Sequence, residues 1–295
     1  MNNPFLEKMG AENDLSLIRA SLEGSQEALE RLILRHQAWI YNISFKMVMD
    51  HDDASDITQE ILIKIITSLA TYDHEKGLFR TWVYRIVANH VLTMKQKKFE
   101  RRIHDFDRYV SLIEQLPDHR SFSHPESGIL VDELKVGCMM GMLMCLNRMA
   151  RLVFLLGAVF DVSDVVGAEI LDISPGNFRK ILSRSRHRVF SYMNGVCGHV
   201  DANNPCRCSF KVKNFLDLGM MDPGNLRYNR PECRRVKEVV SRRLDDFTES
   251  FYGPFLDLFK EQPFYDPPDM TKWLRALVQN DDFKRLFEIS DTTHN

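Results

Sequence analysis

The sequence predicts an all-α protein, and three observations indicate this class. Apolar residues recur at spacings of three and four through most of the chain, which is the period of amphipathic helices. Alternating apolar and polar runs joined by Asn-Gly or Asp-Gly turns, the signal of β-hairpins, are absent from the first two thirds. Serines stand before two later apolar segments, where they can cap helices. We therefore expect two helical domains joined by a flexible linker, followed by a mainly helical C-terminal extension.

The expected elements follow in order along the chain. Helical periodicity covers residues 25–49, 53–72 and 79–98, with the polar loop TYDHEKGLF between the last two. Prolines, serines and mixed charge then interrupt the pattern, which resumes at residue 130 and continues to about residue 194. An irregular segment, NGVCGHVDANNPCRCSF, precedes two further helices over residues 231–290, separated near residues 263–268. The resulting divisions are a first domain at 11–102, a linker at 103–128, a second domain at 129–194 and an extension at 195–295.

Charge and hydropathy limit the classes of function. The net charge of the 295 residues is −2, so a nucleic-acid site must be a local patch. The first residues lack the apolar core of a signal peptide, and the longest apolar run, residues 153–160, is too short to span a bilayer. The sequence therefore predicts a cytoplasmic protein without membrane insertion. Its six cysteines suggest metal or redox chemistry before disulfides, although the spacing of Cys138 and Cys145 places these two in the core.

Charged residues are segregated into three blocks. Five acids and no Lys or Arg occupy residues 50–60. Seven Lys or Arg and one Glu lie in residues 80–102, and five Lys or Arg without an acid lie in residues 179–188. One basic run is commonly a solvated helix face, but two runs on either side of a linker favour two contacts to one extended polyanion.

The first basic block contains a helix that suits single-stranded DNA. One arc of its helical wheel is apolar and is expected in the core: Phe79, Trp82, Val83, Ile86 and Val87. Arg80, Arg85 and Asn89 are expected on exposed faces, where Arg binds phosphate and Asn reads a base edge. Tyr72 in the preceding loop can stack on an unpaired base. The cations that follow the helix would hold phosphate: Lys95, Lys97, Lys98, Arg101 and Arg102.

The second basic block lies in a predicted helix-turn-helix, SDVVGAEILDISPGNFRKILSRSRHRV. Ser163 can cap its first helix. Ser174 can cap the second, with Pro175 at the first helical position, a favoured place for proline. A tight turn before a basic second helix is typical of proteins that read the major groove.

Together these features resemble a bacterial RNA polymerase sigma factor of the extracytoplasmic-function (ECF) group, over roughly residues 15–194. The string FRTWVYRIVAN, residues 79–89, is similar to the promoter-melting helix of that family and carries the resemblance most specifically. An acidic pattern is similar to its polymerase-binding helix: Asp53, Asp56, Gln59 and Glu60. The segment NRMA, residues 147–150, stands where the family usually has a Leu-Pro motif.

The resemblance implies a sigma factor that binds core RNA polymerase, recognises and melts promoter DNA and directs transcription initiation, without enzymatic activity. The loop at residues 72–79 would capture a flipped base of the minus-ten element, with Asn89 beside it. The minus-thirty-five element would be contacted by the helix-turn-helix through Asn177, Arg179, Lys180 and Arg184. The resemblance leaves open an anti-sigma partner. The alternative is a helix-turn-helix regulator that does not bind polymerase, and a zinc enzyme on nucleic acid or a purely structural helical protein are more distant readings.

A minimal member of this group stops near residue 194, so the extension needs its own interpretation. One set of residues could supply three thiolates and one imidazole to Zn(II): Cys197, His199, Cys206 and Cys208. The other reading is a loop whose cysteines pack in a small reduced core. No cofactor is required for the implied function. The apolar residues further along predict that the extension packs on itself or docks on the two domains, which favours a regulatory role.

Overall fold

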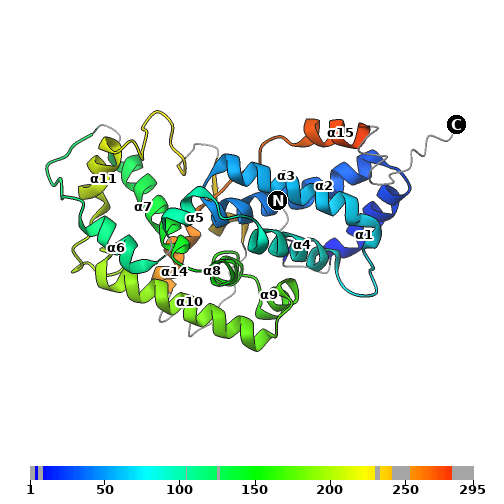
Figure 1. Ribbon diagram of the computed structural model, residues 1–295, viewed down its shortest axis with the longest axis horizontal. Helices are drawn as coiled ribbons and strands as arrows, with labels where there is room; N and C mark the ends of the chain where they lie inside the picture. The colour runs from blue at the N-terminus through cyan, green and yellow to red at the C-terminus, as the bar shows by residue number, and fades with distance from the viewer. Residues whose placement is uncertain are drawn as a thin grey trace.

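A computed structural model of the chain describes residues 4–5, 9–103, 105–124, 127–229, 233–240 and 253–280. The all-α class is confirmed, since the strands among these residues form only one short pair (Figure 1). None of the helices in this described part combines the length and the apolar character needed to cross a bilayer.

The range expected for the first domain contains four helices: α1 (Met9–Leu22), α2 (Gln26–Val48), α3 (His51–Ser68) and α4 (Phe79–Thr93). Ser25 caps α2 by accepting from Ala28 N–H, and Asp50 caps α3 by accepting from Asp52 and Asp53 N–H. Such side-chain caps satisfy amides that have no partner inside the helix. The short helix η1 (Leu69–Thr71) leads into the loop before α4.

The second domain contains α7 (Ser127–Met144), α8 (Arg148–Phe154), the π turn η2 (Leu155–Val159), α9 (Asp164–Leu171) and α10 (Pro175–Val196). The two serine caps are confirmed, because Ser163 Oγ accepts from Val166 N–H at 3.3 Å and Ser174 Oγ accepts from Asn177 N–H at 3.2 Å. Pro175 opens α10, where its missing N–H costs nothing.

The region between the domains is more regular than the sequence indicated. The periodicity at 79–98 ends early, at Thr93, and a separate helix α5 follows at Lys98–Arg102. The range assigned to the linker contains α6 (Phe106–Glu114), which buries Tyr109 and Ile113. The helix has only nine residues and is followed by Pro117, which makes it easy to include in a linker, and Tyr109 joins it to α7 by donating to the Cys138 carbonyl at 3.0 Å.

The extension begins with α11 (Cys208–Asp217) and returns to the first domain. Its later elements are β1 (Arg234–Arg235), α12 (Val236–Val239), α14 (Gly253–Lys260), β2 (Pro263–Phe264) and α15 (Thr271–Gln279). The strands pair antiparallel, with Arg234 opposite Phe264. The expected break between two tail helices therefore contains β2. Residues 231–232, 241–252 and 281–290 of that expectation lie outside the described part of the chain.

One continuous core joins the two domains and the extension. Fully buried Trp39 of α2 contacts Phe5, Phe160 and Phe264, with ring centroids 5.3, 5.5 and 5.0 Å away. Phe259 of α14 packs on Phe154 of α8 at 5.1 Å. In Figure 1, α15 runs along α2, and α9 lies beside α4. The extension is thus part of the packing of both domains.

Candidate nucleic-acid and protein interface

The acidic helix α3 presents two carboxylates of the predicted polymerase-binding pattern to solvent. Asp56 and Glu60 are exposed and lie one turn apart on the same face, while Gln59 is half-buried. Asp53 is also half-buried and forms an ion pair with Lys97 Nζ at 2.9 Å. Asp56 and Glu60 therefore form the part of the predicted acidic pattern that is open to a basic partner.

Glu60 keeps its charge available although His90 is near. His90 Nε2 lies 3.3 Å from Glu60 Oε2, and Lys64 Nζ lies 2.8 Å from His90 Nδ1. Burial and the neighbouring Lys64 ammonium lower the pKa of His90, which outweighs the opposite effect of Glu60. The imidazole is therefore neutral at neutral pH and does not cancel the Glu60 carboxylate.

Aromatic side chains organise the loop before α4. The Tyr72 ring packs on Phe79 and Trp82, with centroids 5.1 and 5.8 Å away, and Phe79 and Trp82 stack at 5.6 Å. Tyr72 Oη donates to the Gly77 carbonyl at 3.0 Å, which closes the loop over the aromatic group. The half-buried Tyr72 is consequently held on a fixed platform, as a residue that stacks on a base must be.

The cations of α4 are not all open to a ligand, because α9 covers part of the helix. Arg85 Nη2 donates to the Glu169 carbonyl at 2.8 Å and lies 3.9 Å from Asp172 Oδ1. Arg80 Nη1 donates to the Pro4 carbonyl at 3.3 Å. Asn89 is exposed as expected. Of these three predicted DNA-binding residues, Asn89 alone has a side chain without a bond to another residue in the described part of the chain.

The helical wheel was wrong about Tyr84, which it placed outside the apolar arc. Its ring is buried and packs on Phe5 and His36, with centroids 4.6 and 5.9 Å away. Contacts on several sides of α4 bury more of the helix than one apolar stripe indicates. Trp82 and Ile86, expected in the core, are half-buried at its edge.

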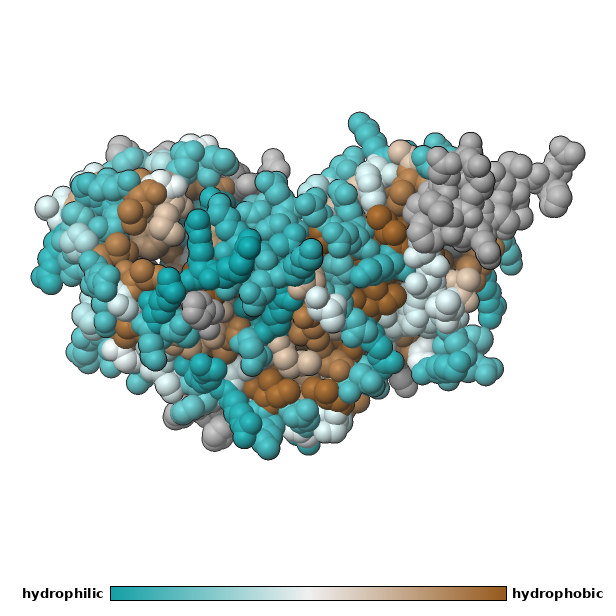
Figure 2. All heavy atoms as spheres, viewed as in Figure 1, coloured by the Kyte–Doolittle hydropathy of each residue, from teal (hydrophilic) through white to brown (hydrophobic). Residues whose placement is uncertain are grey.

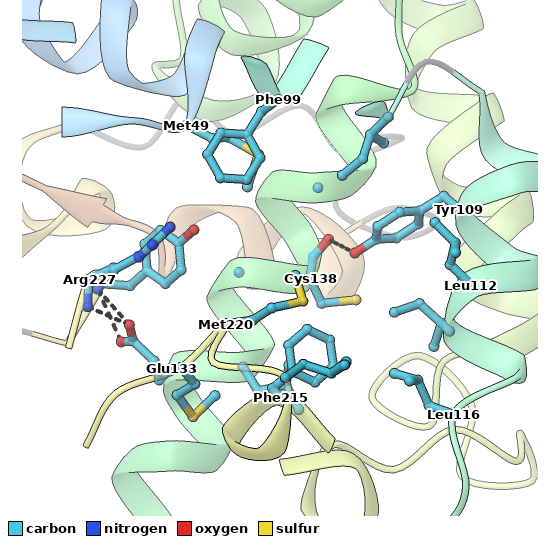
Figure 3. A pocket seen from close by; sticks show the side chains of 18 of the residues that line it. Met49, Phe99, Tyr109, Leu112, Leu116, Glu133, Cys138, Phe215, Met220 and Arg227 are labelled. Carbon is cyan, nitrogen blue, oxygen red and sulfur yellow. Dashed lines mark hydrogen bonds between the residues drawn. The ribbon is translucent and has the colours of Figure 1, made fainter. Parts of the chain in front are cut away.

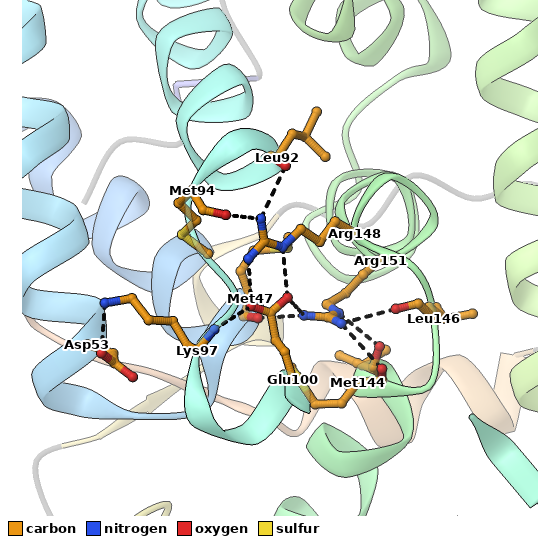
Figure 4. A network of polar contacts seen from close by, with 11 residues as sticks. Met47, Asp53, Leu92, Met94, Lys97, Glu100, Met144, Leu146, Arg148 and Arg151 are labelled. Carbon is orange, nitrogen blue, oxygen red and sulfur yellow. Dashed lines mark hydrogen bonds and ion pairs between the residues drawn. The ribbon is translucent and has the colours of Figure 1, made fainter. Parts of the chain in front are cut away.

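The basic segment after α4 contains a buried ionic network that the sequence did not indicate. Lys95 and Lys98 are exposed, but Glu100 is buried between Arg148 and Arg151 (Figure 4). Arg148 makes two bonds to its carboxylate at 2.9 and 2.8 Å, and Arg151 makes one at 3.1 Å. A single acid among seven cations was the only signal in the sequence.

The same network fastens the two domains together. Arg148 also donates to the carbonyls at the end of α4, Leu92 and Met94. Arg151 donates to the Met47 carbonyl of α2 at 2.6 Å and to carbonyls around the end of α7: Leu143, Met144 and Leu146. The segment NRMA, which departs from the family pattern, thus supplies a cation to this junction.

The helix-turn-helix has the predicted helices and a close contact between them. Gly167 of α9 faces Phe178 of α10, and a β-carbon there would come within 2.3 Å of the ring. Glycine is therefore needed for this approach. The outer face of α10 exposes all four predicted DNA contacts: Asn177, Arg179, Lys180 and Arg184. Arg179 also forms an ion pair with Asp164 of α9.

The cysteine segment brings its candidate ligands together in pairs. Cys197 and Cys206 are partners in an isolated backbone bridge, and Cys208 Sγ lies 3.5 Å from His199 Nε2. Burial raises the pKa of Cys206 and Cys208, so both are protonated thiols in the absence of a cation. Across the described ranges, no three His, Cys, Asp or Glu side chains are placed as ligands of one ion. Zinc at these residues stays a prediction.

Comparisons with known proteins concern mainly the first domain. Residues 32–100 match the family described as Sigma-70 region 2. The ECF RNA polymerase sigma factor SigE of Mycolicibacterium smegmatis is 29% identical over 92 residues, which are 29% of this chain and 35% of that protein. The RNA polymerase sigma-H factor of Pseudomonas aeruginosa is 32% identical over 78 residues, which are 26% of this chain and 40% of that protein.

Two further similarities extend beyond this domain. The ECF RNA polymerase sigma factor SigW of Bacillus subtilis is 25% identical over 176 residues, which are 58% of this chain and 92% of that protein. A structure of CnrH in complex with the cytosolic domain of CnrY aligns with a TM-score of 0.44 and 19% identity, over 62% of this chain and 97% of that one. The chain thus spans less than half of the first two relatives and nearly all of SigW.

Proposed function

Because this chain contains a sigma-70 region 2 and is related to the ECF sigma factors, we propose that it binds core RNA polymerase and directs transcription initiation. The observation that carries the proposal is the exposed pair Asp56 and Glu60 beside the aromatic platform of α4, all within the matched residues 32–100. A protein with this function works in the cytoplasm, where polymerase and DNA are, and is not an enzyme.

Asp56 and Glu60 are the proposed polymerase contacts. Their carboxylates are solvated in the free chain, so a basic partner surface gains charge complementarity without first breaking an ion pair. Asp53 contributes less, because Lys97 already neutralises it. Binding through exposed charges weakens as salt screens them.

Promoter melting is the proposed role of the Tyr72 loop and α4. Unstacking DNA costs about 1.4 kcal/mol per base step. Stacking of a base on an aromatic side chain returns about 1–3 kcal/mol. Tyr72, held by Phe79 and Trp82, offers such a surface at no further ordering cost, and exposed Asn89 lies on the same helix. Capture of a base on Tyr72 would therefore offset part of the opening cost.

We further propose that the free chain is closed and that the extension keeps it so. Arg85 is bonded to α9, so its contact with DNA requires the second domain to move away from α4. Lys260 of α14 pairs with Asp161 at 3.3 Å, which holds the extension to the second domain. Residues 263–268 hold it to the first domain. Together these contacts oppose separation of the two domains.

Residues 263–268 are held on α2 through their main chain. Lys46 Nζ donates to the Pro263 carbonyl at 2.7 Å, and Gln37 Nε2 donates to the Pro268 carbonyl at 3.0 Å. Asn42 makes two bonds with Tyr265, donating to its carbonyl at 2.8 Å and accepting from its N–H at 2.9 Å. These three polar side chains of α2 are fully or almost fully buried under the extension. If residues 263–268 left α2, water would hydrate these three polar side chains, which lowers the cost of separation and favours a reversible contact.

Binding to bacterial core RNA polymerase tests the proposal. The wild type is compared with Asp56→Arg/Glu60→Arg, and the matched control is Glu23→Arg/Glu27→Arg, which reverses two other exposed acids. We expect binding by the wild type and the control and loss in the first variant. Equal binding by all three chains would exclude α3 as the contact.

A chain that ends at residue 196 tests the role of the extension. If the extension keeps the protein closed, the shortened chain binds polymerase more tightly and transcribes from a promoter more strongly. Unchanged binding and transcription would refute regulation by the extension.

The second candidate function is a helix-turn-helix regulator that does not bind polymerase. The exposed cations of α10 favour it, because they need no other domain to reach DNA. Salt-dependent DNA binding by a chain that binds no polymerase in full-length or shortened form would establish this alternative.

A further inference from the structure

An apolar cavity of about 240 Å³ lies where the linker, the second domain and the extension meet. Its walls come mainly from α5, α6, α7, α11 and the segment after α11, with Met49 from the end of α2 (Figure 3). The side chains that form them are mostly aliphatic or aromatic and include Phe99, Ile113, Leu116, Leu134, Phe215 and Met221. Neither the polymerase-binding nor the DNA-binding proposal uses this space.

The walls of the cavity are closely packed. Tyr109 and Tyr228 stand against two glycines of α7, where a β-carbon on Gly137 or Gly141 would come within 3.0 or 2.7 Å of a tyrosine. Tyr109 Oη donates to the Cys138 carbonyl at 3.0 Å, which fixes the ring. The hollow is therefore bounded by side chains with fixed positions.

The entrance of the cavity is also apolar. Leu112, Leu218 and Met220 line it with exposed fractions of 49%, 60% and 54%, which is unusual for large apolar side chains. In Figure 2, apolar side chains gather around a hollow in the part of the surface formed by α6, α7 and α11. Apolar surface that surrounds an opening is typical of a site that an apolar molecule enters.

The charge around the cavity decides the class of ligand. The Glu133 carboxylate lies at one side, buried and bonded to the N–H groups of Arg227, Tyr228 and Asn229. It also accepts from Asn229 Nδ2 at 3.1 Å, so its acceptor positions are occupied. Asp222 is a second acid at the edge, against the single cation Arg227. A buried carboxylate with no bond left to offer disfavours an anionic ligand and gives a cationic one no direct partner.

We propose that this cavity is a binding site for one small, neutral, apolar molecule. An apolar cavity of about 150 Å³ accommodates benzene in another protein, so this one has room for a molecule of roughly one to two fused or linked rings. A volume of about 240 Å³ is too small for a helix, whose diameter with side chains is about 10–12 Å.

Such a ligand would touch helices from the linker, the second domain and the extension at the same time. Leu112, Ile113 and Leu116 belong to α6 or the turn after it, Leu134 belongs to α7, and Phe215 belongs to α11. A molecule in contact with all three helices favours the arrangement in which they are together. Binding would therefore fasten the extension to the linker and the second domain.

Titration of the full chain with phenylnaphthylamine, a neutral apolar dye that fluoresces in apolar surroundings, tests the site. We expect saturable binding of one dye per chain. Leu112→Trp places a larger side chain at the entrance and is expected to weaken dye binding roughly tenfold. Leu22→Trp is the matched control, because Leu22 is equally exposed at 51% on α1 and does not line the cavity.

The titrations distinguish an internal apolar site from an anion site and from a contact between two copies of the chain. The anionic dye anilinonaphthalene sulfonate should bind more weakly than its neutral relative, and stronger binding of the anion would contradict the charge argument. Absence of saturable binding to the wild type, or equal weakening by both tryptophan variants, would overturn the proposal. A third outcome would also overturn it. If the chain binds no dye but forms a concentration-dependent dimer, and Leu112→Trp abolishes that dimer, the entrance is a contact between two copies of the chain. Core RNA polymerase is not used in these measurements, so their outcome is independent of the proposed function.

Discussion

Replacement of Glu100 by alanine is expected to destabilise the protein by about 3–5 kcal/mol, the range for removal of one partner from a buried ion pair. The size of this loss follows from the groups that would be left without the Glu100 carboxylate. Arg151 is only 3% exposed, so its charge stays buried with carbonyl groups as its acceptors. Arg148 loses both of its bonds to the carboxylate. The Lys97 N–H, which donates to Glu100 Oε2 at 3.1 Å, also loses its acceptor.

Equilibrium unfolding in urea measures this free energy. The control is Glu114→Ala, which removes an exposed carboxylate from α6 and should change stability by less than about 0.5 kcal/mol. Glu100→Gln keeps one acceptor oxygen but replaces the other with an NH2 donor and removes the charge, so its stability should fall between that of the wild type and that of Glu100→Ala. A loss below about 1 kcal/mol in Glu100→Ala would refute the reasoning, because the network would then be solvated in the folded protein.

The same carboxylate gives a pH dependence with a defined sign. Burial acts to raise the pKa of Glu100, but hydrogen bonds from Arg148 and the Lys97 amide and the charges of both arginines outweigh it, so the pKa is lowered. The unfolded chain then takes up this proton at a higher pH than the folded chain. Its contribution to stability is present above the ordinary pKa of 4.5 and is lost as the pH falls through the folded value. In Glu100→Ala this part of the acid destabilisation should disappear.

Two other substitutions have outcomes that thermal melting can measure. Gly167→Ala should destabilise the protein by about 1–3 kcal/mol, because the added β-carbon meets the Phe178 ring. Gly195→Ala is the control, because no atom lies within 4 Å of a β-carbon at that position. Equal melting temperatures of the two variants would contradict the packing of α9 on α10. Burial lowers the pKa of Lys46 to about 7 against 10.5 for an ordinary lysine, so the unfolded chain binds more protons between these values and stability should rise with pH there. Lys46→Met should reduce this rise in stability by up to about 1.4 kcal/mol per pH unit. If stability rises equally with pH in the wild type and in Lys46→Met, groups other than Lys46 cause the rise.

Capping residues in the sequence correctly predicted where the two helices of the helix-turn-helix begin. Ser163 and Ser174 each accept a bond from an amide in the first turn of their helix, and Pro175 stands where proline is favoured. The all-α class followed from the periodicity of the long helices. Helix α6 was missed because it is short and lies among prolines and mixed charge, although its apolar residues do recur at helical spacing.

In the candidate interface, too, contacts between residues close in the sequence could be predicted and contacts between distant residues could not. The exposure of Asp56 and Glu60 one turn apart follows from helical spacing, and the contact of Tyr72 with Trp82 spans ten residues. The bonds that occupy Arg85 come from Glu169, which is 84 positions away, and Arg151 reaches Glu100 across 51 positions. Pairs at such separations leave no pattern in a single sequence, so only the folded chain reveals which cations are covered.

The position of Trp39 makes its intrinsic fluorescence a probe of how the parts of the protein are arranged. The indole lies in contact with rings from the N-terminal turn, the second domain and the extension, and it is fully buried. The chain has two other tryptophans, Trp82 and Trp273, and both are half-buried. Separation of any of the three parts from α2 would admit water to Trp39 and shift its emission to longer wavelength. Opening on polymerase, on DNA or after shortening can therefore be followed in the unlabelled protein.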